Sequence, residues 1–237
     1  MRDRRRKRAG GFLSKTALPK MPAFCYCECI SCIKMTASKD TKSNRLQGQK
    51  RPFEPDDIRT IRSILSNQNR PRDLALFCIA IDTMLRGSDI LRLRVQDLTD
   101  HQGQILTTFE FRQRKTGKAV MCGLTEPARK SLEHWITISN KMPWDFLFTS
   151  QRRNADQPIT TGQYRRLVKE WAGFAALDVR HFSGHSTRRT KASIIYRKTG
   201  NAEIVRQLLG HNSITSTSQY LNISAEQAVQ QGLAIKI

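Results

Sequence analysis

Six side chains of the 237-residue chain have the types and spacing that chemistry on a phosphate ester requires. Two guanidiniums can bind the non-bridging oxygens of a phosphodiester in bidentate fashion. A phenol becomes a nucleophile when a base takes its proton and fixed cations stabilise the anionic transition state. Imidazoles transfer protons near neutral pH, and an ammonium can protonate a departing alkoxide. The residues are Arg86, Lys115, His185, Arg188, His211 and Tyr220.

The spacing of these residues supports a common site. His185 and Arg188 are one helical turn apart, so their side chains would share a helix face. His211 follows a Leu-Leu-Gly turn, and Tyr220 comes nine residues later. No acidic cluster is placed to bind Mg²⁺, so we expect phosphoryl transfer without a metal or a cofactor. Each residue alone also fits an ordinary role, such as a helix cap, an exposed turn or half-buried core, and only the whole set argues for chemistry.

The elements that must position this set are mostly helical. Alternating apolar residues at 105–111, a turn at 115–118 and a return at 119–124 predict a β-hairpin with Lys115 at its tip. The second predicted helix reaches Leu85, which places Arg86 at its end. We therefore expect a mainly α fold with a small antiparallel β-sheet (α+β). Apolar spacing predicts helices that begin at Pro55 and near Arg72, and helices at 88–94, 125–138, 160–175, 185–198, 202–209 and 225–230.

The charge of the chain predicts a polyanionic partner. Forty-one Lys and Arg residues against 20 Asp and Glu give a net charge of +21, which favours nucleic acid first and an anionic membrane surface second. Hydrophobic residues make up 38%, enough for a core, which excludes global disorder. The longest apolar run, 74–81, is far shorter than the about 20 residues of a membrane span. The basic start lacks the apolar stretch of a signal peptide, so we expect a cytoplasmic protein with reduced thiols.

The chain divides into an extension at 1–52 and a globular domain at 53–237. We expect the extension to be basic, Cys-containing and disordered, ending in a polar linker at 36–52. Residues 1–20 hold eight Lys or Arg and one Asp, so 8 − 1 = +7, and the rest of the chain keeps 21 − 7 = +14. The basic run is either a DNA-binding arm or a solvated tail. The four thiols between Cys25 and Cys32 leave metal binding open, and Met35 is an alternative start.

Four stretches resemble the tyrosine recombinase (phage integrase) family, and the likeness extends over about 53–231. The last stretch is the most specific, because it joins the Leu-Leu-Gly-His turn to a tyrosine nine residues on. The match around Lys115 is weak. The stretches are TMLRGSDILRLRVQDL at 83–98, RKTGKAV at 114–120, HSTRRTKAS at 185–193 and IVRQLLGHNSITSTSQYLNIS at 204–224.

The resemblance implies a role for each candidate residue. Arg86 and Arg188 would clamp the scissile phosphate, while His185 and His211 hydrogen-bond it and assist proton movement. Lys115 would protonate the 5′-oxygen, and Asp89 would orient its neighbours. Tyr220 would attack phosphorus and form a 3′-phosphotyrosyl link, so that rejoining needs no ATP. The implied protein is a site-specific recombinase or integrase that acts on double-stranded DNA as a homotetramer at the nucleoid, through a Holliday junction, with no membrane or small-molecule substrate.

The sequence also departs from the family pattern. Arg189 stands where a second histidine is common, and Thr187 replaces an aliphatic residue. Only 52 residues precede the predicted globular domain, so the chain resembles short recombinases that consist of the catalytic domain alone, or is a truncated relative. Two other functions stay open, a DNA-binding regulator on a recombinase scaffold and relaxation of DNA like that of type IB topoisomerases. Residues 224–237 would pack on their own subunit or dock on a neighbour.

Overall fold

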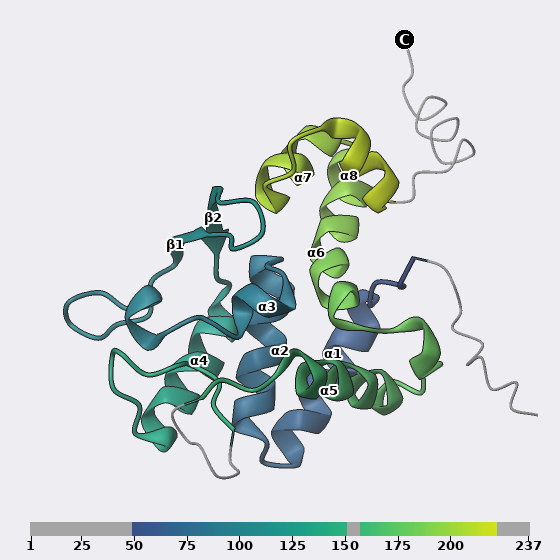
Figure 1. Ribbon diagram of the computed structural model, residues 1–237. Helices are drawn as coiled ribbons and strands as arrows, with labels where there is room; N and C mark the ends of the chain where they lie inside the picture. The colour runs from purple at the N-terminus through teal and green to yellow at the C-terminus, as the bar shows by residue number, and fades with distance from the viewer. Residues whose placement is uncertain (1–48, 151–156, 222–237) are drawn as a thin grey trace, which may run out of the picture. The chain divides into compact units, whose positions relative to one another are not determined.

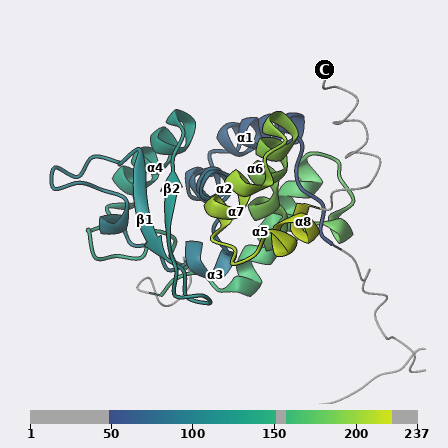
Figure 2. The same cartoon turned by 90° about the horizontal axis from the view of Figure 1, so that it is seen from above.

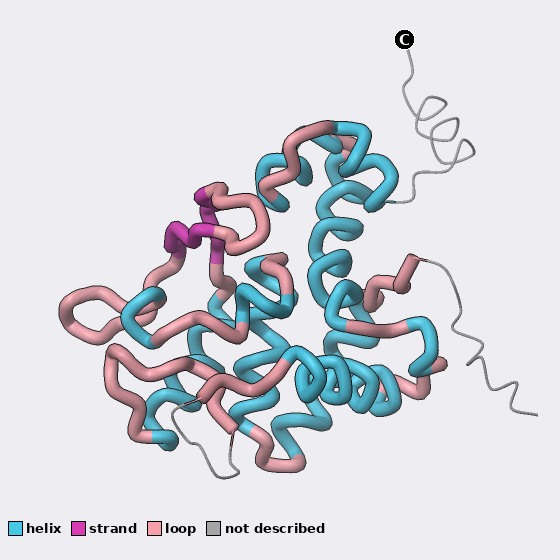
Figure 3. Tube along the Cα trace, viewed as in Figure 1, coloured by secondary structure: helices cyan, strands magenta, loops and turns pink. Residues whose placement is uncertain are grey.

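The computed structural model describes residues 49–150 and 157–221, and the predicted fold class is confirmed within them. Figure 3 shows that helices dominate and that strands form a single hairpin. Two 3₁₀ turns, η1 (Val95–Asp97) and η2 (Val179–His181), join longer elements. The helices are α1 (Pro55–Asn67), α2 (Pro71–Thr83), α3 (Gly87–Ile90), α4 (Glu126–Ser139), α5 (Thr161–Phe174), α6 (Gly184–Thr199), α7 (Ala202–Leu209) and α8 (Ile214–Leu221).

Helix α2 forms the centre of the domain. Its sequence is apolar on all sides, and the residues from Ala75 to Ile81 are all buried, as expected for a helix that other elements surround. It packs against α1, α4 and α6. Figures 1 and 2 show the hairpin and α4 on one side of α2, and α1, α5 and α6 on the other. The active-site candidates therefore extend from one rigid core.

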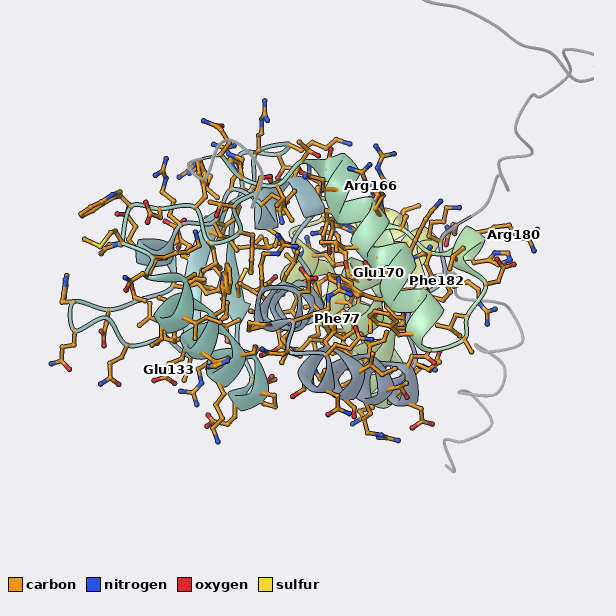
Figure 4. The ribbon with its side chains drawn as sticks, turned by 90° about the horizontal axis from the view of Figure 1, so that it is seen from below. Phe77, Glu133, Arg166, Glu170, Arg180 and Phe182 are labelled. Atoms are coloured by element: carbon orange, nitrogen blue, oxygen red, sulfur yellow. The ribbon has the colours of Figure 1, made fainter. Side chains whose placement is uncertain are left out.

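Aromatic side chains fill the space between α1, α2 and α5. Phe77 of α2 meets Trp171 of α5 edge-on at 5.2 Å between ring centroids, and Phe53 stacks on Phe182 at 4.8 Å. Figure 4 shows Phe77 and Phe182 inside the domain, whereas Arg180 points outward. Burying each such ring contributes roughly 1.5–3 kcal/mol, so this cluster fixes the start of α6, which follows Phe182 directly.

The hairpin consists of β1 (Thr108–Arg112) and β2 (Ala119–Gly123), with Phe109 opposite Cys122 and Phe111 opposite Val120. Phe109, Val120 and Cys122 are buried and the intervening residues are mostly exposed, which is the alternation that the sequence predicts. The strand begins at Thr108 instead of 105, because Ile105 pairs with Thr99 in an isolated bridge. The tip of the hairpin lies beside the end of α7.

Two predicted helix boundaries near Arg86 are wrong. Helix α2 ends at Thr83, because Met84 adopts a left-handed conformation with φ of 52° and turns the chain. The third helix covers Gly87–Ile90 and not 88–94, with Arg86 as its N-cap residue. Arg86 therefore does not end α2 but lies in an extended segment between two helices, and Gly87 is not a C-terminal cap.

One helix was not predicted, and several predictions concern residues that the structure does not describe. Helix α8 was not predicted, although it carries Tyr220. The predicted helix at 225–230, the thiols of Cys25–Cys32, Met35 and the basic run at 1–20 lie outside the described residues. The boundary at 53 stays a prediction, but residues 50 and 51 contact the domain, since the amide of Arg51 donates to the carbonyl of His181 at 3.0 Å. No helix in the described ranges is long and apolar enough to span a bilayer.

Candidate active site

Arg188 is the most firmly held of the six candidate residues. It lies in the first turns of α6, is 2% exposed, and donates to the carbonyls of Met84 at 2.5 Å and Leu209 at 2.8 Å. The left-handed turn at Met84 aims the first of these carbonyls at α6. Burial lowers the pKa of Arg188, and the nearby charge of Arg86 lowers it further. The two guanidiniums that the sequence predicts to act together therefore do lie together.

Arg86 is connected to the Leu209 carbonyl through the side chain of Gln113. Its guanidinium donates to the side-chain oxygen of Gln113, and the amide nitrogen of Gln113 donates to the Leu209 carbonyl at 3.0 Å. Gln113 is 1% exposed and lies at the base of the hairpin tip. The Leu209 carbonyl thus orients Arg188 directly and Arg86 through one intermediate side chain.

Gly210 makes this arrangement possible. It ends α7 with φ of 66°, a conformation that L-residues rarely adopt. A Cβ atom at this position would also lie 2.6 Å from Val120 and 3.0 Å from the Gln113 amide nitrogen. The Leu-Leu-Gly-His turn therefore needs glycine both for its backbone and for its contact with the hairpin.

His211 joins the arginines to α8. Its Nε2 lies 3.5 Å from Arg188, and its Nδ1 lies 3.1 Å from the hydroxyl of Thr217. Arginine can only donate, so Nε2 accepts and Nδ1 carries the proton. Burial, with the charges of Arg188 and Arg86, lowers the pKa of His211 to about 4. The imidazole is therefore neutral at physiological pH.

The Tyr220 hydroxyl faces this group. The ring lies 5.4 Å from that of His211 between centroids, nearly perpendicular to it. Its hydroxyl is buried and forms no hydrogen bond of normal geometry with the described residues. Burial raises the pKa of Tyr220 to about 12, against the opposing charges of Arg188 and Arg189. The phenol is thus protonated at rest and needs a base to become a nucleophile.

His185 and Lys115 lie at the open side of the site. His185 begins α6, where its backbone amide donates to the N-cap side chain of Ser183 at 3.3 Å, and its own side chain is exposed. Desolvation of the imidazole lowers the pKa of His185, and nearby positive charges lower it further, those of Arg188, Arg189, Arg86 and Lys115. Lys115 is exposed at the hairpin tip and its charge reaches His185, so all six predicted residues contribute to one region.

Asp89 lies beneath this region. The residue is fully buried, and one carboxylate oxygen accepts from the backbone amide of Arg114 at 3.3 Å. Its negative charge raises the pKa of Arg188. Asp89 therefore connects α3 to the hairpin tip and offsets part of the positive charge that the site concentrates.

Sequence reasoning did not single out three residues that support the site. Gln113 links the guanidinium of Arg86 to α7, and the Thr217 hydroxyl accepts from the protonated Nδ1 of His211. Arg189 was noted only as a departure from a family pattern, yet its guanidinium lies 4.8 Å from the centre of the Tyr220 ring. The proximity of Gln113 to Lys115 and of Thr217 to Tyr220 was the only signal available in the sequence.

Solved structures of similar fold are tyrosine-type recombinases. The crystal structure of XerA recombinase matches with a TM-score of 0.64 at 20% identity, over 79% of this chain and 65% of that one. The pre-cleavage complex of XerH site-specific recombinase with its difH substrate matches with a TM-score of 0.62 at 19% identity, over 79% and 55%. At these identities the likeness establishes the fold, which is that of a recombinase catalytic domain.

The sequence itself matches the phage integrase family over residues 51–227. The chain belongs to this family of tyrosine recombinases, as its motifs predict. A tyrosine recombinase of Pseudothermotoga lettingae is 30% identical over 152 residues, which are 64% of this chain and 50% of that protein. The probable integrase/recombinase YoeC of Bacillus subtilis is 28% identical over 171 residues, 71% of this chain and 87% of that protein. The chain thus spans about half the length of the first relative and most of the second.

Proposed function

We propose that this protein is a site-specific DNA recombinase that cleaves and rejoins double-stranded DNA through a 3′-phosphotyrosyl intermediate. One observation carries the proposal: the buried hydroxyl of Tyr220 faces Arg188, which also contacts His211 and lies near Arg86. An anionic phosphate placed among these cations would supply the hydrogen-bond acceptor that the described residues do not offer to the phenol.

In the proposed reaction the Tyr220 oxygen bonds to phosphorus as the bond from phosphorus to the 5′-oxygen breaks. The phenolic proton passes to a neutral imidazole, a state that the lowered pKa values of His185 and His211 favour. Lys115 gives a proton to the leaving 5′-oxygen. Arg86 and Arg188 bind the non-bridging oxygens, whose charge grows in the transition state. Attack by a 5′-hydroxyl on the phosphotyrosine reverses the step, which conserves the bond energy.

The assembly and the substrate are part of the proposal. The net charge of +21 suits DNA, and the integrase of the Tn1549 transposon, which shares the fold, was solved with transposon right end DNA. We infer a homotetramer on two duplexes, acting at the nucleoid, from the family resemblance. Light scattering of the protein with a duplex that carries its target site would test this, since four protomers per two duplexes are expected.

A nicked suicide substrate tests the chemistry. Cleavage next to the nick releases a short fragment that carries the 5′-hydroxyl and diffuses away. Religation is then impossible, so a covalent protein–DNA complex accumulates and survives denaturing electrophoresis. We expect wild type to form this complex and Tyr220→Phe to form none. Tyr196→Phe, which removes a phenol hydroxyl from a different helix, α6, is the matched control and should react like wild type. DNA flanking the gene supplies the candidate sites.

The same assay separates the two other functions. A DNA-binding regulator would bind a site selectively with wild type and Tyr220→Phe alike, and neither would cleave. A topoisomerase-like enzyme would relax supercoiled plasmid that carries no target site, and Tyr220→Phe would abolish this relaxation. Either result would replace the recombinase assignment.

A further inference from the structure

Arg189 is the charged residue of the HSTRR motif that the proposed chemistry leaves without a role. Although it is 6% exposed, each of its hydrogen bonds goes to a neutral oxygen. Burying a guanidinium with no carboxylate partner among the described residues is costly unless its donors are well satisfied. Its surroundings therefore call for a specific explanation.

Two of its contacts are made with the nucleophile. Arg189 donates to the backbone carbonyl of Tyr220, and its guanidinium lies 4.8 Å from the centre of the Tyr220 ring. The carbonyl belongs to the last turn of α8, where backbone oxygens have no partner within the helix. One planar group thus fixes both the end of the helix and the face of the phenol.

Its other contacts are made with the chain just before α1. Arg189 donates to the Lys50 carbonyl at 2.9 Å and to the side-chain oxygen of Gln49. The segment is held further by Lys50, whose ammonium donates to the Arg180 carbonyl at 2.9 Å, and by Arg51. Residues more than 165 positions apart in the sequence, 49–50 and 220, therefore meet on one side chain.

We propose that Arg189 is a positioning residue that holds Tyr220 in the site and couples this placement to the segment at 49–50. This inference rests on the proposed function and deepens it. Helix α8 is short and contains four Ser or Thr residues in its eight positions, so it has little intrinsic stability. The contacts of Arg189 with Tyr220 and with residues 49–50, here called the clip, supply the tertiary contact that such a helix needs. Loss of the clip would let Tyr220 move away from Arg188.

Hydrogen–deuterium exchange of the full-length protein tests the clip without any DNA. We expect Arg189→Met to raise the exchange rate of the amides in 214–221 at least tenfold. Arg197→Met is the matched control, because Arg197 also lies on α6 and joins it to the chain before α1 through Glu54 at 2.7 Å. In the part of the chain that the structure describes, no hydrogen bond or ring contact joins Arg197 to Tyr220. Arg197→Met should leave these rates unchanged. Equal rates in wild type and Arg189→Met would overturn the proposal.

Two further variants test the geometry of the contact. Arg189→Lys keeps the charge but cannot reach three acceptors at once, so we expect an intermediate rise in exchange. Arg189→Lys also allows exchange in α8 to be measured if Arg189→Met fails to fold. Gln49→Ala should raise exchange in α8 about threefold, and Gln49→Glu, which keeps an acceptor oxygen, should restore it. A Gln49→Ala variant with wild-type exchange would overturn the coupling to the 49–50 segment.

Single-turnover cleavage of the suicide substrate tests whether the placement of Tyr220 by Arg189 affects the reaction. We expect Arg189→Met to cleave at least tenfold more slowly at saturating enzyme, with DNA affinity within threefold of wild type. Faster cleavage would show that Arg189 restrains Tyr220 and would overturn the proposal. If wild type traps no DNA, the recombinase assignment fails, whereas the exchange experiment still decides whether the clip exists.

Discussion

The proposed chemistry requires neutral imidazoles beside a cluster of fixed cations. Burial and the charges of Arg188 and Arg86 hold the pKa of His211 near 4, against about 6.5 in the unfolded chain. Between these two values the unfolded chain binds more protons than the folded one. Stability from this group is therefore fully present above pH 6.5 and falls as the pH drops toward 4.

Urea denaturation at pH 7.5 and pH 5.0 measures this effect. We expect wild type to lose about 2 kcal/mol more of its unfolding free energy than His211→Gln over this interval. The variant removes only the titration of His211, so His185, whose pKa is lowered in the same direction, contributes equally to both proteins. Equal losses would show that the folded protein tolerates a charged His211.

Gln113 determines how Arg86 is aimed. Replacing it with Met keeps the volume but removes the acceptor for Arg86 and the donor to the Leu209 carbonyl. A misplaced guanidinium loses about 1–3 kcal/mol of transition-state stabilisation, so single-turnover cleavage should fall roughly 5- to 150-fold. DNA affinity should stay within threefold. Gln102→Met, in an exposed turn, is the control. An unchanged cleavage rate in Gln113→Met would show that Gln113 does not orient Arg86 for catalysis.

The elements around the site could be predicted where local sequence determines them. Helix α1 begins at Pro55 with a capping box between Glu54 and Asp57, and the alternation of the hairpin is visible in its apolar residues. Helix α8 was missed because Ser and Thr have modest helix propensity and its apolar residues are few. It is stabilised by contacts from outside the helix, those of the nearby His211 and of Arg189 on α6.

The same distinction applies to the site. The six candidate residues could be chosen from type and spacing, because the motifs that carry them are local. The turn at Met84 was not, because it depends on Arg188, which lies 104 positions later and donates to its carbonyl. Gly87 is required by a similar long-range contact, since a Cβ there would lie 2.8 Å from the ring of Tyr164. Such constraints exist only after the helices have packed.

Asp82 joins three helices below the site. One carboxylate oxygen accepts from the amide and the hydroxyl of Thr125 at 2.8 and 2.6 Å, and the other from the Lys191 ammonium at 3.0 Å. It thereby fixes α2 to the start of α4 and to the middle of α6. Because the carboxylate is buried, Asp82→Ala leaves several donors without a partner.

We expect Asp82→Ala to lower the unfolding free energy by about 2–3 kcal/mol in urea denaturation. Glu133→Ala on the exposed face of α4, labelled in Figure 4, should change it by less than about 0.5 kcal/mol. A similar small effect for both variants would mean that packing of α2 alone holds the three helices together.

At the scale of the whole molecule, positive charge is spread along the chain. Residues 1–20 carry +7 and the remainder +14, so removing the first segment leaves two thirds of the net charge. The cations of the site account for a few of these charges. In the proposed complex the rest would be available for backbone phosphates of the duplex, and each such contact would release counterions.

Binding to a target duplex should therefore depend steeply on salt. Each phosphate contact lowers log affinity by about 0.9 per unit of log salt concentration, so six contacts would weaken binding roughly a thousandfold between 50 and 200 mM. Because the +14 remainder contains the family-matched residues, a variant lacking residues 2–20 should keep most of this slope. Fluorescence anisotropy across this salt range measures both proteins. A steep slope for the full chain and a flat one for the variant would assign DNA binding to the basic extension, and a flat response in both would contradict a phosphate-tracking surface.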